Sequence, residues 1–313
     1  MKSVRQYIGI LITGILLFYL VKPFLQTHTT LKYVDFQIQW HWLLFSFGLI
    51  IFHLSAYLYP LTKLLNGVTE KSVSFRDAWL LFHLSNVTRY LPGRIWGVIR
   101  FLSLCKQFGL SKTAVGSSLT LHVGIETFLG GILAVSLLFS HQMRGVVQGV
   151  LKKFTENAFI AIVAIIVILV GSFFLIPMLS SKARQFTKTL RDIGELLLQK
   201  SFWGQWVKII VSHMLLWMCQ GFAFFLFVRS LTPVKWMLAG VLSACFAFAW
   251  FVGFLSFLTP GGLGIREGLL AILLANYMPT PQATRIALLC RVWMLAAEIA
   301  LAAIAFLYNR RKQ

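Results

Sequence analysis

The chain has 313 residues, of which 58% are hydrophobic and 12% charged, and its mean hydropathy is +0.79. A soluble core of this size cannot bury so much apolar surface, so the composition indicates a polytopic membrane protein. The net charge of +20 does not indicate nucleic-acid binding, because Lys and Arg lie in short segments beside long apolar runs rather than on a soluble basic face.

Six apolar runs are long enough to cross a bilayer as helices. They cover residues 7–25, 40–65, 114–139, 158–179, 207–228 and 283–308. The first run has no small-residue cleavage site and is followed by further spans, so we expect a retained helix rather than a signal peptide. Trp40, Trp42, Tyr57 and Tyr59 near the ends of the second run are typical of membrane interfaces.

Two other segments, 75–107 and 235–278, differ from ordinary spans. Each contains an apolar stretch, an interruption at Pro92-Gly93 or at Pro260-Gly261-Gly262, and a second, shorter apolar stretch. Proline and glycine also occur in membrane helices as simple kinks. Two interruptions at matching places, each beside arginines that are costly in lipid, favour broken or re-entrant helical hairpins.

The order span, span, interrupted segment, span occurs twice, in residues 7–139 and 158–308, with a loop at 140–157 between the two halves. The sequence therefore predicts an all-α fold in one integral-membrane domain: six full spans plus two hairpins, arranged as an inverted-topology repeat. The asymmetry of Lys and Arg between loops predicts that both termini lie in the cytoplasm. The basic segment 181–203 is either a helix on anionic lipid or a solvated linker.

Each interruption leaves free backbone N–H groups at the start of the following helix, and these groups favour an anion such as a lipid phosphate. Arginines flank both interruptions, and their forked guanidinium groups can bind phosphate through two hydrogen bonds. The predicted headgroup site consists of Arg89, Pro92, Gly93, Arg94 and Arg100 in the first half and Pro260, Gly261, Gly262, Arg266 and Arg291 in the second. His83, Asn86 and Tyr90 share the helix face that leads to the first break.

Carboxylates within membrane spans are costly and are usually paired or functional. Glu126 lies one turn after His122, and Glu298 lies two turns after Arg291 on the same face. Both glutamates fit either a structural pair with arginine or a role in substrate or proton handling. For Glu267, beside Arg266 at a helix start, we expect a structural role at the helix dipole.

The stretches NVTRYLPGRIWGVIR and FLTPGGLGIREGLLA resemble the lysylphosphatidylglycerol synthase transmembrane family, which shares its membrane region with the multiple peptide resistance factor. The resemblance covers nearly the whole chain, and PGGLGIREG followed by a span with Arg291 is its most specific part. It implies a lipid flippase. The longest stretch outside the predicted membrane segments is short, so we expect no synthase domain and no aminoacyl transfer.

We therefore expect a flippase of the bacterial cytoplasmic membrane that carries a lipid with an anionic headgroup, needs no cofactor or metal, and acts alone or beside a lipid-synthesising enzyme. The five arginines of the predicted site outnumber the three glutamates Glu126, Glu267 and Glu298, which favours an anionic phospholipid over a cationic lysyl lipid. The alternatives are a polyprenyl-phosphate-sugar flippase, a membrane enzyme that uses His83 or His122 on lipid phosphates, and a scaffold for such an enzyme.

The predicted topology can be tested with single cysteines in a cysteine-free background. Cysteines at Gln148 and Gln313 should react with an impermeant thiol reagent from opposite sides of the membrane, because an inverted repeat places the connecting loop and the C-terminus on different sides. Labelling of both positions from one side would contradict the inverted repeat.

Overall fold

The computed structural model describes residues 38–68, 72–86, 101, 105, 110, 112–140, 143–146, 148–149, 152, 203–255 and 264–310. Every regular element in these parts is a helix. The α-helices are α2 (Trp40–Ala56), α3 (Leu58–Val68), α4 (Phe75–Asn86), α6 (Lys112–Val135), α9 (Trp203–Leu231), α10 (Ala239–Leu255), α11 (Ile265–Leu274) and α12 (Thr280–Arg310); short 3₁₀ helices are η3 (Ser136–Phe139) and η5 (Trp236–Leu238). The predicted all-α class is thereby confirmed for the described residues.

Five helical stretches in this part of the chain are long and apolar enough to cross a membrane: Trp40–Gly67, Val115–Val135, Trp203–Leu231, Trp236–Phe254 and Thr280–Asn309. The chain is a multi-pass membrane protein. Four of these stretches match predicted spans, and the fifth is the apolar helix that precedes the second interruption. The predicted spans 7–25 and 158–179, nearly all of the basic segment 181–203 and both Pro-Gly interruptions lie outside the described residues.

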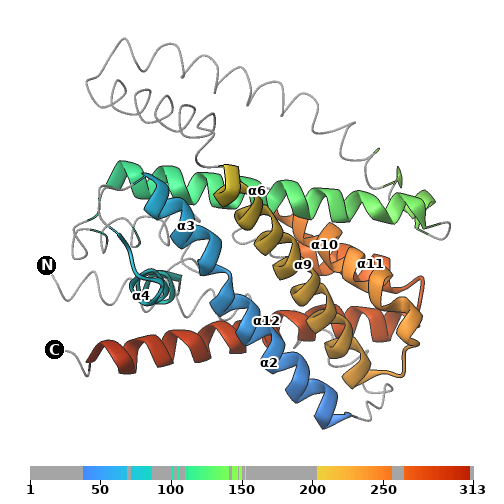
Figure 1. Cartoon of the computed structure of the whole chain (residues 1–313). Coiled ribbons are helices and arrows are strands. Elements are labelled where there is room, and N and C mark those ends of the chain that lie inside the picture. The colour runs from blue at the N-terminus through green and yellow to red at the C-terminus, as the bar shows by residue number, and fades with distance from the viewer. Residues whose placement is uncertain are drawn as a thin grey trace, which may run out of the picture.

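The second predicted span consists of two helices, α2 and α3, which meet at Tyr57 (Figure 1). Pro60 lies in the first turn of α3 and has no N–H to donate to the carbonyl four residues earlier, so the hydrogen-bonded ladder is interrupted here. The sequence analysis placed Tyr57 at a membrane interface. The structure instead places it half-buried at this junction, from which its side chain faces α6.

Among the described helices, the most extensive contact is the antiparallel one between α2 and α9. Three hydrogen bonds between the two helices are spaced seven residues apart. Seven residues are about two helical turns, so the bonded groups lie on one face of each helix. The pairs are the Gln39 N–H with the Ser230 carbonyl at 2.8 Å, Ser46 Oγ with the Ala223 carbonyl at 2.9 Å, and His53 Nδ1 with the Leu216 carbonyl at 3.0 Å. This regular spacing holds the two helices in one register.

The other helices pack around this seam in a reciprocal pattern. α6 packs against α10, the helix before the second interruption, and α12 packs against α4, the helix before the first. α6 also contacts α9, while α12 contacts α2. In Figure 1, α6 and α12 run in opposite directions across the molecule. Each half of the chain thus packs its last long helix against the other half.

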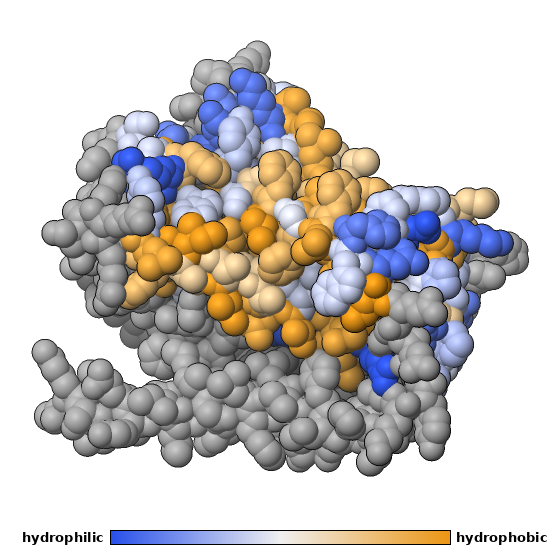
Figure 2. All heavy atoms as spheres, turned by 90° about the horizontal axis from the view of Figure 1, so that it is seen from below, coloured by the Kyte–Doolittle hydropathy of each residue, from blue (hydrophilic) through white to orange (hydrophobic). Residues whose placement is uncertain are grey.

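Much of the outer surface of the helices is apolar, as lipid contact requires. The exposed large hydrophobic residues include Leu44 and Phe52 on α2 and Leu215 and Met218 on α9. Figure 2 shows hydrophobic residues gathered over the middle of one face, with hydrophilic residues toward its sides. α9 and α12, with 29 and 31 residues, are ~43 and ~46 Å long at 1.5 Å per residue. Both exceed the ~30 Å hydrocarbon core, so they must tilt or protrude.

α9 and α10 approach closely at Gly221, where a Cβ atom would lie 2.6 Å from Ser243 Cβ. We expect Gly221→Ala to lower the free energy of unfolding by ~1–3 kcal/mol, because the overpacked helices must separate. The matched control is Gly48→Ala on α2, where a Cβ would meet nothing within 4 Å and where alanine favours the helix. Denaturant unfolding in detergent micelles measures both variants. Equal stability of the two would contradict the close approach.

Candidate functional site

The helix after the second interruption begins with a backbone turn that only glycine adopts easily. Gly264 has φ +85°, in the left-handed region. Its N–H donates to a carboxylate oxygen of Glu267 at 2.8 Å, so Glu267 caps the first turn of α11 and lies at the positive end of the helix dipole. Glu267 therefore lies at the start of α11, next to Arg266.

Arg266 is buried, with 8% of its surface exposed. Its guanidinium carbon lies 4.9 Å from the centre of the Phe246 ring on α10, and its Nη2 lies 2.9 Å from Met294 Sδ on α12. A ring face and a thioether are weak partners for a guanidinium compared with a carboxylate or a phosphate. These two contacts place the guanidinium between α10 and α12.

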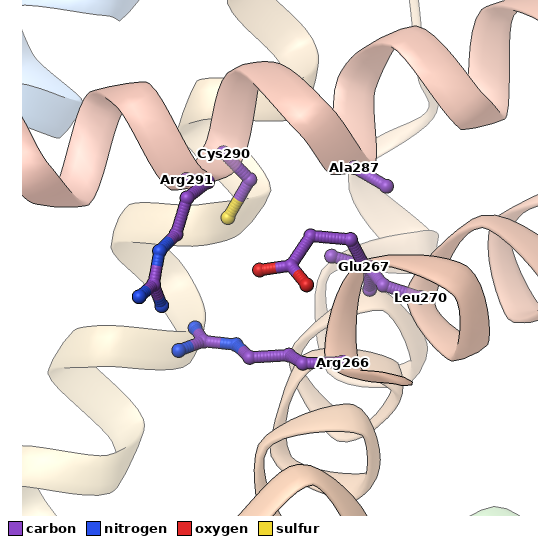
Figure 3. Close-up of a pocket in the computed structure, with 6 residues that line it drawn as sticks. All are labelled: Arg266, Glu267, Leu270, Ala287, Cys290 and Arg291. Atoms are coloured by element: carbon purple, nitrogen blue, oxygen red, sulfur yellow. The ribbon is translucent and has the colours of Figure 1, made fainter. Parts of the chain in front are cut away.

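A pocket lies beside this guanidinium, between α11 and α12. Its cavity volume is about 10 Å³, and it is lined by Arg266, Glu267, Leu270, Ala287, Cys290 and Arg291. Figure 3 shows the guanidinium groups of Arg266 and Arg291 pointing toward one another, with the Glu267 carboxylate beside them. Two positive groups and one negative group leave a net charge of +1, so the pocket can attract a small anion.

The close packing of α10 against α11 depends on Gly253. A Cβ atom there would lie 3.0 Å from Arg266 Cβ, so a larger residue would push Arg266 away from its place between α10 and α12. Gly253 and Met294 were not singled out from the sequence, because their importance comes from contact with a helix that follows a break.

A second polar cluster lies where α3, α6 and α9 meet, and it shares no residue with the arginine pocket. The Tyr57 hydroxyl donates to a carboxylate oxygen of Glu126. Trp217 Nε1 on α9 donates to the Glu126 backbone carbonyl at 3.1 Å. His122 Nδ1 lies 3.0 Å from His213 Nε2 on α9. We name Tyr57, His122, Glu126 and His213 the histidine cluster.

The sequence singled out His122 and Glu126 but missed Tyr57 and His213. The rule that selected His122, a costly polar side chain within an apolar span, also applies to His213. An aromatic chain of contacts continues from the cluster to α4: Tyr57 lies 5.8 Å from Phe82 and Phe82 5.4 Å from His83, measured between ring centres. His83 is 1% exposed, so it is a buried residue of α4 rather than a surface one.

The remaining predicted site residues are only partly covered by the structure. Glu298 is buried on α12, 6% exposed, two turns beyond Arg291 and not among the pocket-lining residues. Asn86 is the last residue of α4. Those that lie outside the described residues are Arg89, Tyr90, Pro92, Gly93, Arg94, Arg100, Pro260, Gly261 and Gly262.

Residues 6–302 match the family described as the lysylphosphatidylglycerol synthase TM region. The chain belongs to this family. The match covers nearly the whole chain and is to the membrane region of the synthases, with no catalytic synthase domain detected in these residues. Comparisons with curated proteins and with solved structures gave no match.

The hydrogen bond between Tyr57 and Glu126 gives a stability prediction. Tyr57→Phe should lower the free energy of unfolding by ~0.6–1.7 kcal/mol, the range measured for side-chain hydrogen bonds between membrane helices. Tyr59→Phe is the matched control, because Tyr59 is 41% exposed and its ring contact with Lys63 survives the change. Equal unfolding curves for both variants would show that the Tyr57 hydroxyl contributes nothing.

Proposed function

We propose that the protein is a lipid flippase, which moves a lipid with an anionic, phosphate-bearing headgroup between the leaflets of the bacterial cytoplasmic membrane. The observation that carries the proposal is the convergence of Arg266 and Arg291 on one pocket between α11 and α12 (Figure 3). The family membership supports it, because the matched region is the membrane part of proteins named for a phosphatidylglycerol lipid.

The cost of arginine in a membrane explains why this convergence favours an anion. An arginine at the centre of a membrane helix costs ~2.5–3.5 kcal/mol or more. Two guanidinium groups that point toward one another add mutual repulsion. A phosphate between them would remove the repulsion and accept hydrogen bonds from both forks. The arrangement therefore favours binding an anionic group over a purely structural role.

The size of the pocket limits what it can hold. Its cavity volume of about 10 Å³ is at the lower end of the ~10–15 Å³ that one water molecule needs, and far below the ~300–1,000 Å³ of pockets that enclose a drug-sized ligand. A phosphate would therefore enter only when the two arginine side chains or the helices α11 and α12 move apart, and a whole lipid would not fit. The acyl chains would stay in the bilayer while the charged part of the headgroup binds between α11 and α12.

The packing of the helices supports an inverted repeat around this site. A two-fold axis in the membrane plane relates corresponding helices in opposite directions. The corresponding pair α2 and α9 is antiparallel, and α6 and α12 run in opposite directions (Figure 1). In such a repeat α6 corresponds to α12 and α4 to α10. The contact of α6 with α10 therefore corresponds to the contact of α12 with α4, and both are present. Rocking of one half against the other would then give alternating access.

The first half contributes to the same mechanism in this proposal. Both interruptions would form re-entrant hairpins, and Arg89, Arg94 and Arg100 of the first half would present a second set of guanidinium groups to the headgroup. The positive-inside pattern would place both termini in the cytoplasm.

The alternatives differ in what the arginines do. A flippase for a polyprenyl-phosphate sugar would use them for the same phosphate chemistry, with a different lipid tail and sugar. A membrane enzyme would show turnover of the lipid rather than movement. A scaffold for a lipid-synthesising enzyme would not need the arginines at all.

Leaflet-resolved transport in liposomes tests the proposal. Arg266→Ala and Arg291→Ala should each weaken binding of a phosphate-bearing lipid, because each removes a charge-assisted hydrogen bond worth ~1.5–3 kcal/mol, about 10- to 150-fold in affinity. Arg266→Lys keeps the positive charge but cannot form two parallel hydrogen bonds to phosphate, so its loss of affinity should be intermediate. Transport of anionic phospholipid and of polyprenyl-phosphate sugar is measured side by side.

The control for these variants is Lys208→Ala, because Lys208 is an exposed cation on α9 outside the pocket. All variants are compared at equal amounts of folded protein, checked by melting in detergent. Unchanged transport in Arg266→Ala and Arg291→Ala would favour the scaffold, and chemical change of the lipid would favour the enzyme.

A further inference from the structure

The two histidines of the histidine cluster are buried and bonded to one another across the two halves of the chain. His122 on α6 and His213 on α9 are each 1% exposed. Their rings are 4.9 Å apart between centres, with His122 Nδ1 3.0 Å from His213 Nε2. The other nitrogen of His213, Nδ1, lies 2.8 Å from the Ile209 carbonyl one turn earlier.

This geometry determines which nitrogens carry hydrogen when both rings are neutral. A carbonyl can only accept a hydrogen bond, so His213 Nδ1 must be the N–H that donates to Ile209. A neutral imidazole has one N–H, so His213 Nε2 carries a lone pair. His122 Nδ1 must then donate to it, and the lone pair of His122 remains at Nε2. That atom is buried and has no hydrogen-bond partner within the described part of the chain.

We propose that His122 and His213 form a proton-binding site within the membrane, with His122 Nε2 as the atom that takes up the proton. Uptake at Nε2 leaves every existing hydrogen bond in place and turns the bond from His122 to His213 into a charge-assisted one. Uptake by His213 would instead place an N–H against the N–H of His122. His213 is therefore a positioning residue, which holds His122 in the tautomer with a free Nε2.

A carboxylate on the same face of α6 can offset the charge that the proton brings. Glu126 is one turn after His122 on α6, and it accepts a hydrogen bond from the Tyr57 hydroxyl. The Tyr57 ring lies 4.3 Å from the His122 ring, edge to face. An imidazolium beside an ionised Glu126 forms a neutral pair, which avoids the cost of an isolated buried charge.

Other titratable groups lie on the helices packed around the site. α3 carries Tyr59, which is 41% exposed, and Lys63, whose Nζ lies 5.4 Å from the Tyr59 ring. α9 supplies His213. α2 supplies His53, which lies 6.2 Å from Tyr57 between ring centres and has Nδ1 beside the Leu216 carbonyl. α4 supplies His83, separated from Tyr57 by Phe82. α10 has Cys245, which lies in the main core with α11 and α12 rather than at the cluster.

The place of the pair in the fold gives the bound proton a consequence. His122 belongs to the first half and His213 to the second, and their hydrogen bond is a direct link between the two. A proton that strengthens this bond stabilises the arrangement in which the halves meet here. Its use to drive lipid movement rests on the proposed function, whereas proton binding itself does not.

Nitrogen-15 NMR of the protein in lipid nanodiscs, with labelled histidine, tests the proposal without any transport assay. At about pH 9 both rings should be neutral with hydrogen on Nδ1. As the pH falls to about 5, across the range in which histidine usually titrates, the His122 Nε2 resonance should move from the unprotonated to the protonated position while its Nδ1–H is retained. Both rings remaining neutral over this whole range would overturn the proposal.

Three variants separate the site from other histidines. His122→Gln should remove the titrating resonance, whereas His41→Gln, at an exposed histidine of α2, should leave it unchanged. His213→Leu should let His122 populate both neutral tautomers, because Nδ1 loses its acceptor; a His122 spectrum unchanged by His213→Leu would contradict the positioning role. A titrating His122 in a protein that moves no lipid would support the proton site and refute the proposed function.

Discussion

The antiparallel seam between α2 and α9 is the contact on which the other helix positions depend. Three of its hydrogen bonds, centred on Ser46 and repeated seven residues to either side, join groups of the α2 segment to carbonyls of α9. A weaker one joins Cys219 Sγ on α9 to the Leu49 carbonyl at 3.8 Å. In lipid, apolar burial does not drive helices together, so specific packing and hydrogen bonds set the register. A shift of one turn would break all three bonds at once.

Both polar sites follow from this register. α9 carries His213 and Trp217 to α6 at the depth where Tyr57 leaves the junction of α2 and α3, which assembles the histidine cluster. On its other side α9 packs against α10, and α10 in turn places Gly253 and Phe246 against Arg266. The arginine pocket and the histidine cluster are therefore separate in composition but supported by the same helix, so movement of α9 would affect both.

Hydropathy predicted the described spans well, because a segment in lipid must satisfy its own backbone hydrogen bonds and does so as a helix. The cost of charge in lipid also identified Arg266, Arg291, His122 and Glu126. The local sequence pattern did not reveal which residues these side chains contact. Tyr57 resembles an interfacial aromatic until the bend at Pro60 is known, and His213 lies 91 positions from His122. The approach of Gly253 to Arg266 depends on a tertiary contact that no periodicity encodes.

The distance in sequence between the two histidines has a consequence for synthesis in the cell. His122 enters the membrane with α6, and its partner is made 91 residues later, about 5–18 s at the usual rate of translation. During that interval the first half must hold a histidine and a glutamate in the bilayer without the helix that completes their hydrogen bonds. Arrival of α9 then gives the Nδ1–H of His122 its acceptor and adds a second donor, Trp217 Nε1, to the backbone carbonyl of Glu126. The two halves thus assemble in sequence. The second half docks onto the polar surface formed by His122 and Glu126 of the first half.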